Sequence, residues 1–262
     1  MMRAAPCGKK PCKSTAKRGP PSSRPTTRRT TGLAPAPSRS ANRSELRALW
    51  RKEWQSELRS RNGLLAATLF GFLAVVALTM PASTERLTPA VASAQLAVVV
   101  LFSVMIAVPR LFLTEDEQGT LDTLRLWADP GAIFLAKALM GMVLCIGQAL
   151  LMGGAFFILT NATVTQPFIA LAGLVAYGAA LAATVSMASA LVPGAQNRWL
   201  IALVISLPLC LPVVVFGTGV MAAALGSQKE TSGWLTVGVL LVTAVATLVL
   251  GAVSTRAIWR LR

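Results

Sequence analysis

Acidic side chains gather in one short segment of this sequence, RLFLTEDEQGTLDTLRLWADP, residues 110–130. The chain has ten acidic residues, and four of them lie between positions 115 and 122: Glu115, Asp116, Glu117 and Asp122. Together with the apolar side chains of the same segment, this density suits docking to another protein. A charge run next to apolar sequence is also typical of a solvated loop, so both interpretations stay open.

The acidic segment has the length of one short helix followed by a turn. Thr114 can cap the start of such a helix, and acids in its first turns are favoured by the helix dipole. Leu121, Leu124 and Leu126 supply an apolar side. Asp129-Pro130-Gly131 is a helix-breaking sequence. We therefore expect a helix within residues 114–130.

Several other kinds of chemistry are excluded by residue type. The chain has no histidine, which removes histidine acid–base catalysis, HExxH zinc chemistry and histidine ligation of haem iron. It also lacks the GxxxxGK[ST] loop that cradles ATP phosphates. Its cysteines are scattered and suggest neither a disulfide framework nor a zinc site: Cys7, Cys12, Cys145 and Cys210. We expect no catalytic residue, no metal site and no directly bound cofactor.

The composition indicates a membrane protein. Hydrophobic residues make up 54% of the chain, charged residues 13%, and the mean hydropathy is +0.62. The formal charge of +15 is uneven, because residues 1–44 hold eleven Lys/Arg and no acid. Residues 45–262 carry only +4, so the charge does not indicate nucleic-acid binding by the main part of the chain.

Residues 1–44 form a basic extension that we expect to be disordered, because it has hardly any large apolar side chain to bury. Three interpretations stay open: a tail that touches anionic lipid or a misassigned start, an organellar transit peptide, and a nucleic-acid-binding arm. The prolines speak against the amphipathic helix of a transit peptide.

Residues 45–262 contain six apolar runs of the length that crosses a bilayer, about 20 residues for a core of about 30 Å. They are Leu64–Met80, Val91–Leu113, Ala132–Leu159, Phe168–Val192, Leu200–Leu225 and Trp234–Ile258. The expected fold is an all-α polytopic membrane protein with six transmembrane helices.

The distribution of cations predicts the orientation. The loops on the side of the N-terminus, with the C-terminal tail, carry Arg110, Arg125, Lys137, Arg198, Arg256, Arg260 and Arg262. The opposite loops hold only Arg86 and Lys229. The positive-inside rule therefore places both termini and the acidic segment in the cytoplasm.

Apart from Arg110 and Arg256 at the ends of their spans, Lys137 is the one Asp, Glu, Arg or Lys side chain inside the spans, and it lies near enough to a helix end to snorkel. An ion-coupled carrier usually needs more intramembrane charges, so the energy source is expected elsewhere. The fourth span has small residues on one face, Ala182, Ser186 and Ala190, which favours close helix packing over a substrate role.

The fifth span contains Pro208 and Pro212 one turn apart, followed by Gly217. Each interior proline removes a backbone hydrogen bond and bends the helix. A static kink and a moving hinge both fit this pattern.

Residues 44–62, SELRALWRKEWQSELRSRN, have Trp50, Trp54 and neighbouring leucines at three- and four-residue steps among cations. We expect an amphipathic helix that lies in the membrane interface and contacts lipid. An ordinary surface helix and a calmodulin-like target are the alternatives.

The order of these elements resembles the permease subunits of ABC exporters of the second type (ABC-2). In such proteins an acidic segment with a GTL-x-x-L sequence after the second span is the coupling helix, which sits in a groove of a partner ATPase. The resemblance assigns this role to Glu115, Asp116, Glu117, Gln118, Gly119, Thr120, Leu121 and Leu124.

Over residues 45–262 the chain is similar to one family of this group, haem exporter protein B of the cytochrome c maturation system. The similarity rests on EDEQGTLDTLRLW, GAIFLAKAL and the two-proline stretch SLPLCLPVVVFGTGVMAAA. The 44-residue extension departs from the family.

The resemblance implies a permease subunit that is not itself an enzyme. It also implies a multi-pass protein of the bacterial inner membrane, with an organellar inner membrane as the alternative. Its partners would be an A subunit that binds and hydrolyses ATP, a haem-handling C subunit, a small D subunit and a haem chaperone, with two permease copies or one permease and a C subunit per complex. The energy of ATP hydrolysis would drive export of haem or release of the haem-loaded chaperone. Because this chain has no histidine, we expect release or gating, with haem ligation left to partners. An exporter of a drug, lipid or glycan and a non-transporting scaffold are the alternatives.

Overall fold

The computed structural model describes residues 51, 61–80, 88–117, 129–192, 197–227 and 232–260. These belong to one compact unit within residues 37–262. The predicted extension 1–44 and most of the predicted interface helix, with Trp50 and Trp54, lie outside the described residues.

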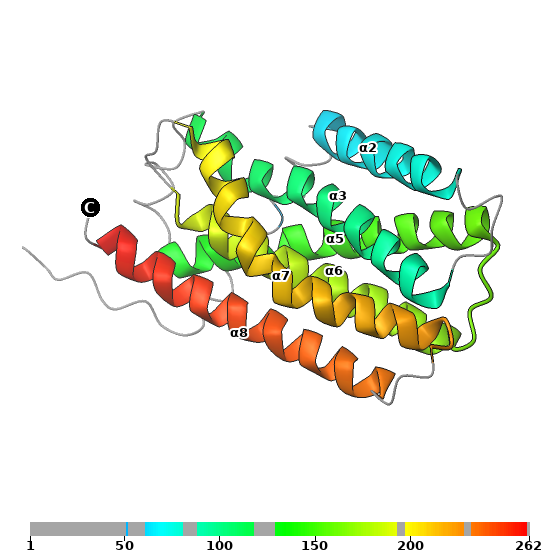
Figure 1. The fold of residues 1–262 in the computed structure, drawn as a ribbon. Helices are drawn as coiled ribbons and strands as arrows, with labels where there is room; N and C mark the ends of the chain where they lie inside the picture. Colours follow the sequence, from blue (N-terminus) through cyan, green and yellow to red (C-terminus); the bar gives the residue numbers. More distant parts are fainter. Residues whose placement is uncertain are drawn as a thin grey trace, which may run out of the picture. The chain divides into compact units, whose positions relative to one another are not determined.

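The described residues form helices and connecting turns, without a strand (Figure 1). The helices are α2 (Arg61–Thr79), α3 (Pro89–Glu117), α5 (Pro130–Thr160), α6 (Pro167–Ala190), α7 (Arg198–Ala224) and α8 (Gly233–Arg260). Each matches one of the six predicted apolar runs to within a few residues. The expected all-helical polytopic architecture is confirmed.

Five of these helices, α3 and α5 to α8, are long and apolar enough to cross a membrane. In α2 the apolar part, Leu65–Thr79, is shorter. The whole of α2 has 19 residues, which corresponds to about 28 Å at 1.5 Å per residue, close to the thickness of a bilayer core.

The helix starts follow simple backbone rules. α3, α5 and α6 each begin at a proline, which has no N–H to satisfy and whose φ angle suits the first helical position. α5 ends at Asn161, whose φ of 48° is the left-handed conformation common at helix C-termini. The apolar runs are therefore bounded by residues that favour helix ends.

α6 is the central helix of the bundle. It packs against α3, α5, α7 and α8, and most of its side chains are buried. The expected close packing of its small face is confirmed, because Ala182 and Ser186 are fully buried and Ala190 is nearly so. Gly178 brings α6 close to α5, where a Cβ atom would lie 3.1 Å from the Cys145 carbonyl oxygen.

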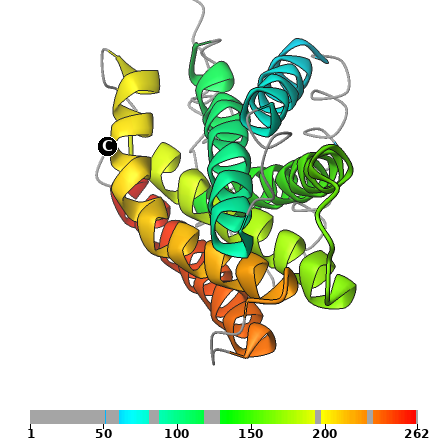
Figure 2. The same ribbon diagram turned by 45° about the vertical axis from the view of Figure 1, so that its right-hand side comes forward.

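α2 lies at the edge of the bundle, beside α3 and α5 (Figures 1 and 2). Its outward side chains Leu65, Leu69 and Leu73 are exposed. Similar exposed aliphatic faces run along α7 and α8, for example at Val204 and Val245. Such faces suit contact with lipid chains, because hydrocarbon does not penalise exposed apolar side chains.

Candidate functional site

The acidic cluster begins within α3. Because α3 continues to Glu117, the backbone of Glu115, Asp116 and Glu117 forms its last turn. The expected helix start at Thr114 is therefore wrong: Thr114 lies inside α3, since no helix-breaking residue follows Pro109 until Gly119.

This boundary reverses the expected electrostatics. Carboxylates stabilise the first turn of a helix, but here they occupy the last turn, where the dipole favours cations, and α3 has no basic residue there. Helix electrostatics therefore do not explain why acids are placed at this position.

The remaining residues of the predicted docking segment, Gln118, Gly119, Thr120, Leu121 and Leu124, lie outside the described residues. Whether they form a helix stays a prediction. The structure describes where the segment leaves α3 and where it enters α5. We call this end of the bundle the acidic end, and the end where α5 passes to α6 the opposite end.

Lys137 links α3 to α5 at the acidic end. Its side chain is only 2% exposed, and its Nζ atom donates a hydrogen bond to the Leu111 carbonyl oxygen at 2.9 Å. The same Nζ lies 5.9 Å from the centre of the Phe112 ring, within the range of a cation–π contact. The expectation that Lys137 snorkels is therefore wrong, because its ammonium group reaches across to α3 instead.

A second charged contact holds the start of α5. Arg256 of α8 donates to Asp129 Oδ2 from Nε at 3.0 Å and forms an ion pair from Nη2 at 2.9 Å. Gly131 makes room for the Arg256 side chain, because a Cβ atom at position 131 would lie 2.9 Å from the Arg256 Cζ atom. The acidic segment thus leaves α3 beside Lys137 and enters α5 beside Arg256.

The two prolines of α7 lie on its exposed face. α7 is one helix through Pro208 and Pro212, and its buried side carries Ala202, Ser206 and Cys210 instead. The two proline rings therefore face away from the buried side of α7. Whether this region is a static kink or a hinge stays open.

Gly217 has a packing role that the sequence did not reveal. A Cβ atom at this position would overlap the ring of Tyr177 on α6. The Tyr177 hydroxyl in turn donates to the Ala97 carbonyl oxygen of α3 at 2.9 Å. Tyr177 is the single tyrosine of the chain and joins three helices. A lone tyrosine within an apolar run was the feature of the sequence that could have indicated this packing role.

A buried polar network crosses the middle of α2, α3 and α5. Gln148 Nε2 donates to Ser103 Oγ at 2.7 Å, and Thr68 Oγ1 donates to Gln148 Oε1 at 3.0 Å. Ser103 Oγ donates to the Ala67 carbonyl oxygen at 3.3 Å. Sequence reasoning looked for charges within the spans and missed these neutral groups.

Two of the four cysteines lie in the described part of the chain. Cys145 and Cys210 are both fully buried. No cluster of three or more His, Cys, Asp or Glu side chains there suits a metal ion.

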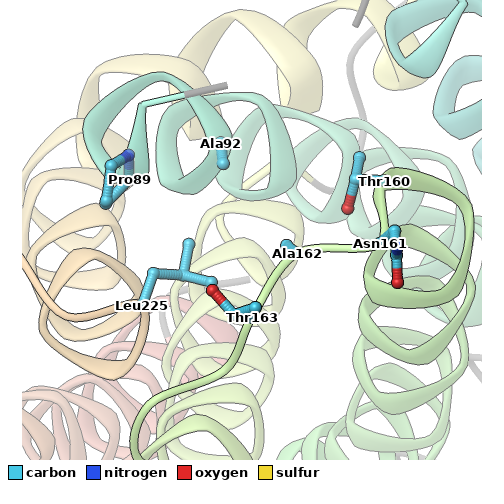
Figure 3. A pocket seen from close by; sticks show the side chains of 7 residues that line it. All are labelled: Pro89, Ala92, Thr160, Asn161, Ala162, Thr163 and Leu225. Carbon is cyan, nitrogen blue, oxygen red and sulfur yellow. The ribbon is translucent and has the colours of Figure 1, made fainter. Parts of the chain in front are cut away.

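The opposite end contains a cavity of about 360 Å³ (Figure 3). Its lining comes from the first turn of α3 at Pro89 and Ala92, the end of α5 at Thr160, the segment after it at Thr163, and Leu225 directly after α7. Among the residues that the structure describes, no charged side chain lines the cavity, and none of the lining residues belongs to the predicted site.

A comparison with protein families matches most of the chain. The family model described as CcmB protein matches residues 44–261 of the chain. No curated protein matches it. The match starts where the predicted interface helix starts and leaves out the basic extension. The chain belongs to the CcmB protein family, and it is accordingly a multi-pass membrane permease subunit of an ABC-type complex in cytochrome c maturation and haem export.

Proposed function

We propose that this chain is the driven subunit of its complex and that residues 115–124 dock into a groove of the partner ATPase. The ATPase binds and hydrolyses ATP. Closure of the ATPase pair moves the acidic segment, and the motion passes into the helices joined to it, α3 and α5. Each nucleotide state must then favour one arrangement of the helices.

The position of the acidic cluster carries this proposal. Three carboxylates in the last turn of α3 are unfavourable for the helix alone, so a complementary cationic surface would offset their cost. Both ends of the segment are also held by cations of the bundle, Lys137 and Arg256. A segment anchored in this way passes on displacement better than a loose loop.

The work is used to release a haem-loaded chaperone or to gate its access, with haem ligated by the C subunit or the chaperone. The lack of histidine and the burial of Cys145 and Cys210 support this division of roles. The complex also holds a small D subunit, and either two permease copies or one permease and the C subunit. It lies in the bacterial inner membrane with both chain termini in the cytoplasm.

The experiment is purification of the complex in mild detergent with Glu117→Lys. Retention of the ATPase should fall by at least about tenfold, because reversing a charge inside a complementary interface costs more than the 1.4 kcal/mol of one decade. Glu230→Lys is the matched control, since it reverses a glutamate between α7 and α8, at the opposite end. Equal ATPase retention and equal ATP turnover in both variants would contradict the proposal.

A further inference from the structure

Lys137 is the one charged side chain that is buried among the described residues. It lies in the second turn of α5, from which a lysine side chain usually extends to the nearby membrane surface. A buried ammonium group is costly unless hydrogen bonds and charges offset the loss of water. Its direction across the bundle therefore indicates a specific role.

The contact that Lys137 makes lies just before the acidic cluster. Its acceptor, the Leu111 carbonyl oxygen, is one helical turn before Glu115. A charged donor in a low-dielectric setting forms a stronger hydrogen bond than a neutral one. The last turns of α3 are thus tied to α5 by a directional bond as well as by apolar packing.

Aromatic rings extend this contact toward α8. Phe112, next to the Lys137 ammonium, lies 6.0 Å from the Phe134 ring, measured between ring centres. Phe134 is 1% exposed and packs so closely on α8 that a Cβ atom at Gly251 would overlap its ring. On the other side of the acidic segment, Asp129 is paired with Arg256 of the same helix, α8.

We propose that Lys137 is a positioning residue for the acidic segment, holding the end of α3 against α5 so that the two helices move as one unit when the segment is displaced. This inference rests on the proposed function. Without the ammonium group, displacement of the segment would separate α3 from α5, and ATP turnover would no longer be linked to work at the rest of the complex.

The experiment compares Lys137→Met, which keeps an unbranched apolar side chain, with Lys137→Arg, which keeps a cationic donor. Lys229→Met, at the opposite end, is the matched control for loss of one lysine. In the full complex, Lys137→Met should retain the ATPase but lose at least about fivefold in chaperone released per ATP hydrolysed, the lower limit of ordinary coupling strengths. Lys137→Arg should recover part of this loss, and Lys229→Met should match the native chain.

A distance measurement in the native complex gives a readout that does not depend on these variants being stable. Spin labels at the exposed positions Phe102 of α3 and Val143 of α5 report the α3–α5 separation in the otherwise native complex. The separation should stay the same with and without trapped ATP, and Lys137→Met should make it nucleotide-dependent.

The possible outcomes separate the two proposals. A native α3–α5 distance that changes with ATP, or a Lys137→Met complex that releases chaperone as efficiently as the native one, overturns the positioning role while the docking function stands. A native chain that retains no ATPase overturns the docking function itself, and the positioning role with it.

Discussion

The two glycines of α7 differ in what surrounds them. At Gly217 the ring of Tyr177 packs directly on the backbone, and the Tyr177 hydroxyl is bonded to α3 beyond. At Gly219 the nearest side-chain atom to a Cβ would be Thr236 Cγ2, at 3.9 Å. The first glycine therefore permits a close contact among α3, α6 and α7, while the second has room for a methyl group.

Replacing Gly217 by Ala should destabilise the protein by about 1–3 kcal/mol, the usual cost of adding a methyl group to a tightly packed site. Thermal unfolding of the purified protein in detergent measures the change. Gly219→Ala is the control and should unfold at the native temperature or slightly above it, because alanine favours helix. If both variants unfold alike, the Tyr177 contact does not limit the packing of α7.

α2 differs from the other helices in how it is attached. It packs against α3 and α5 and exposes many large apolar side chains. Hydrogen bonds set its register, since Gln148 and Ser103 bond to Thr68 and to the Ala67 carbonyl oxygen. Apolar packing alone allows a helix to slide against its neighbours, whereas paired donors and acceptors favour one position.

Gln148→Leu should weaken the attachment of α2 and lower the free energy of unfolding by about 0.6–2 kcal/mol, the range measured for hydrogen bonds between membrane helices. Unfolding by denaturant in mixed micelles measures this change. Gln166→Leu, at an exposed position before α6, is the control and should have little effect.

A double-variant cycle tests whether the bond itself is responsible. Gln148→Leu and Ser103→Ala together should lower the stability by less than the sum of the two single changes, with a coupling of about 0.6 kcal/mol. Additive effects would mean that the Gln148–Ser103 bond does not stabilise the bundle.

The described helices of the bundle alternate in direction, so that α3 ends, α5 begins and α8 ends at the acidic end. The cations Arg110, Arg125 and Arg198 lie in the sequence near this end, while only Arg86 and Lys229 lie near the other. Burial of Lys137 removes one cation from the membrane surface without changing this asymmetry. The asymmetry of the cations therefore still favours an acidic end that faces the cytoplasm.

Thiol labelling tests this orientation. In a chain whose four cysteines are replaced, Thr163→Cys in the exposed segment between α5 and α6 should react with an impermeant maleimide added outside the cells. Thr123→Cys in the acidic segment should react only in inverted membrane vesicles. The reverse pattern would place the acidic end outside and remove it from reach of a cytoplasmic ATPase.

The positions of the helices were predictable because they depend on local properties. A backbone in lipid must satisfy its own hydrogen bonds, so an apolar run of sufficient length becomes a helix. Proline and asparagine then mark many of its ends. One boundary was wrong, at Thr114, because a residue that can cap a helix does not interrupt one that is already formed.

Apart from the small-residue face of α6, the buried faces of the helices were not predictable, and they determine the site. In α7 apolar residues surround the helix almost evenly, so no periodic pattern distinguishes its buried side from its exposed side. The outward direction of Pro208 and Pro212, the contact of Gly217 with Tyr177 and the burial of Lys137 all depend on which helices meet. Segments distant in sequence create these environments, as when Arg256 reaches Asp129, so only the packed bundle sets them.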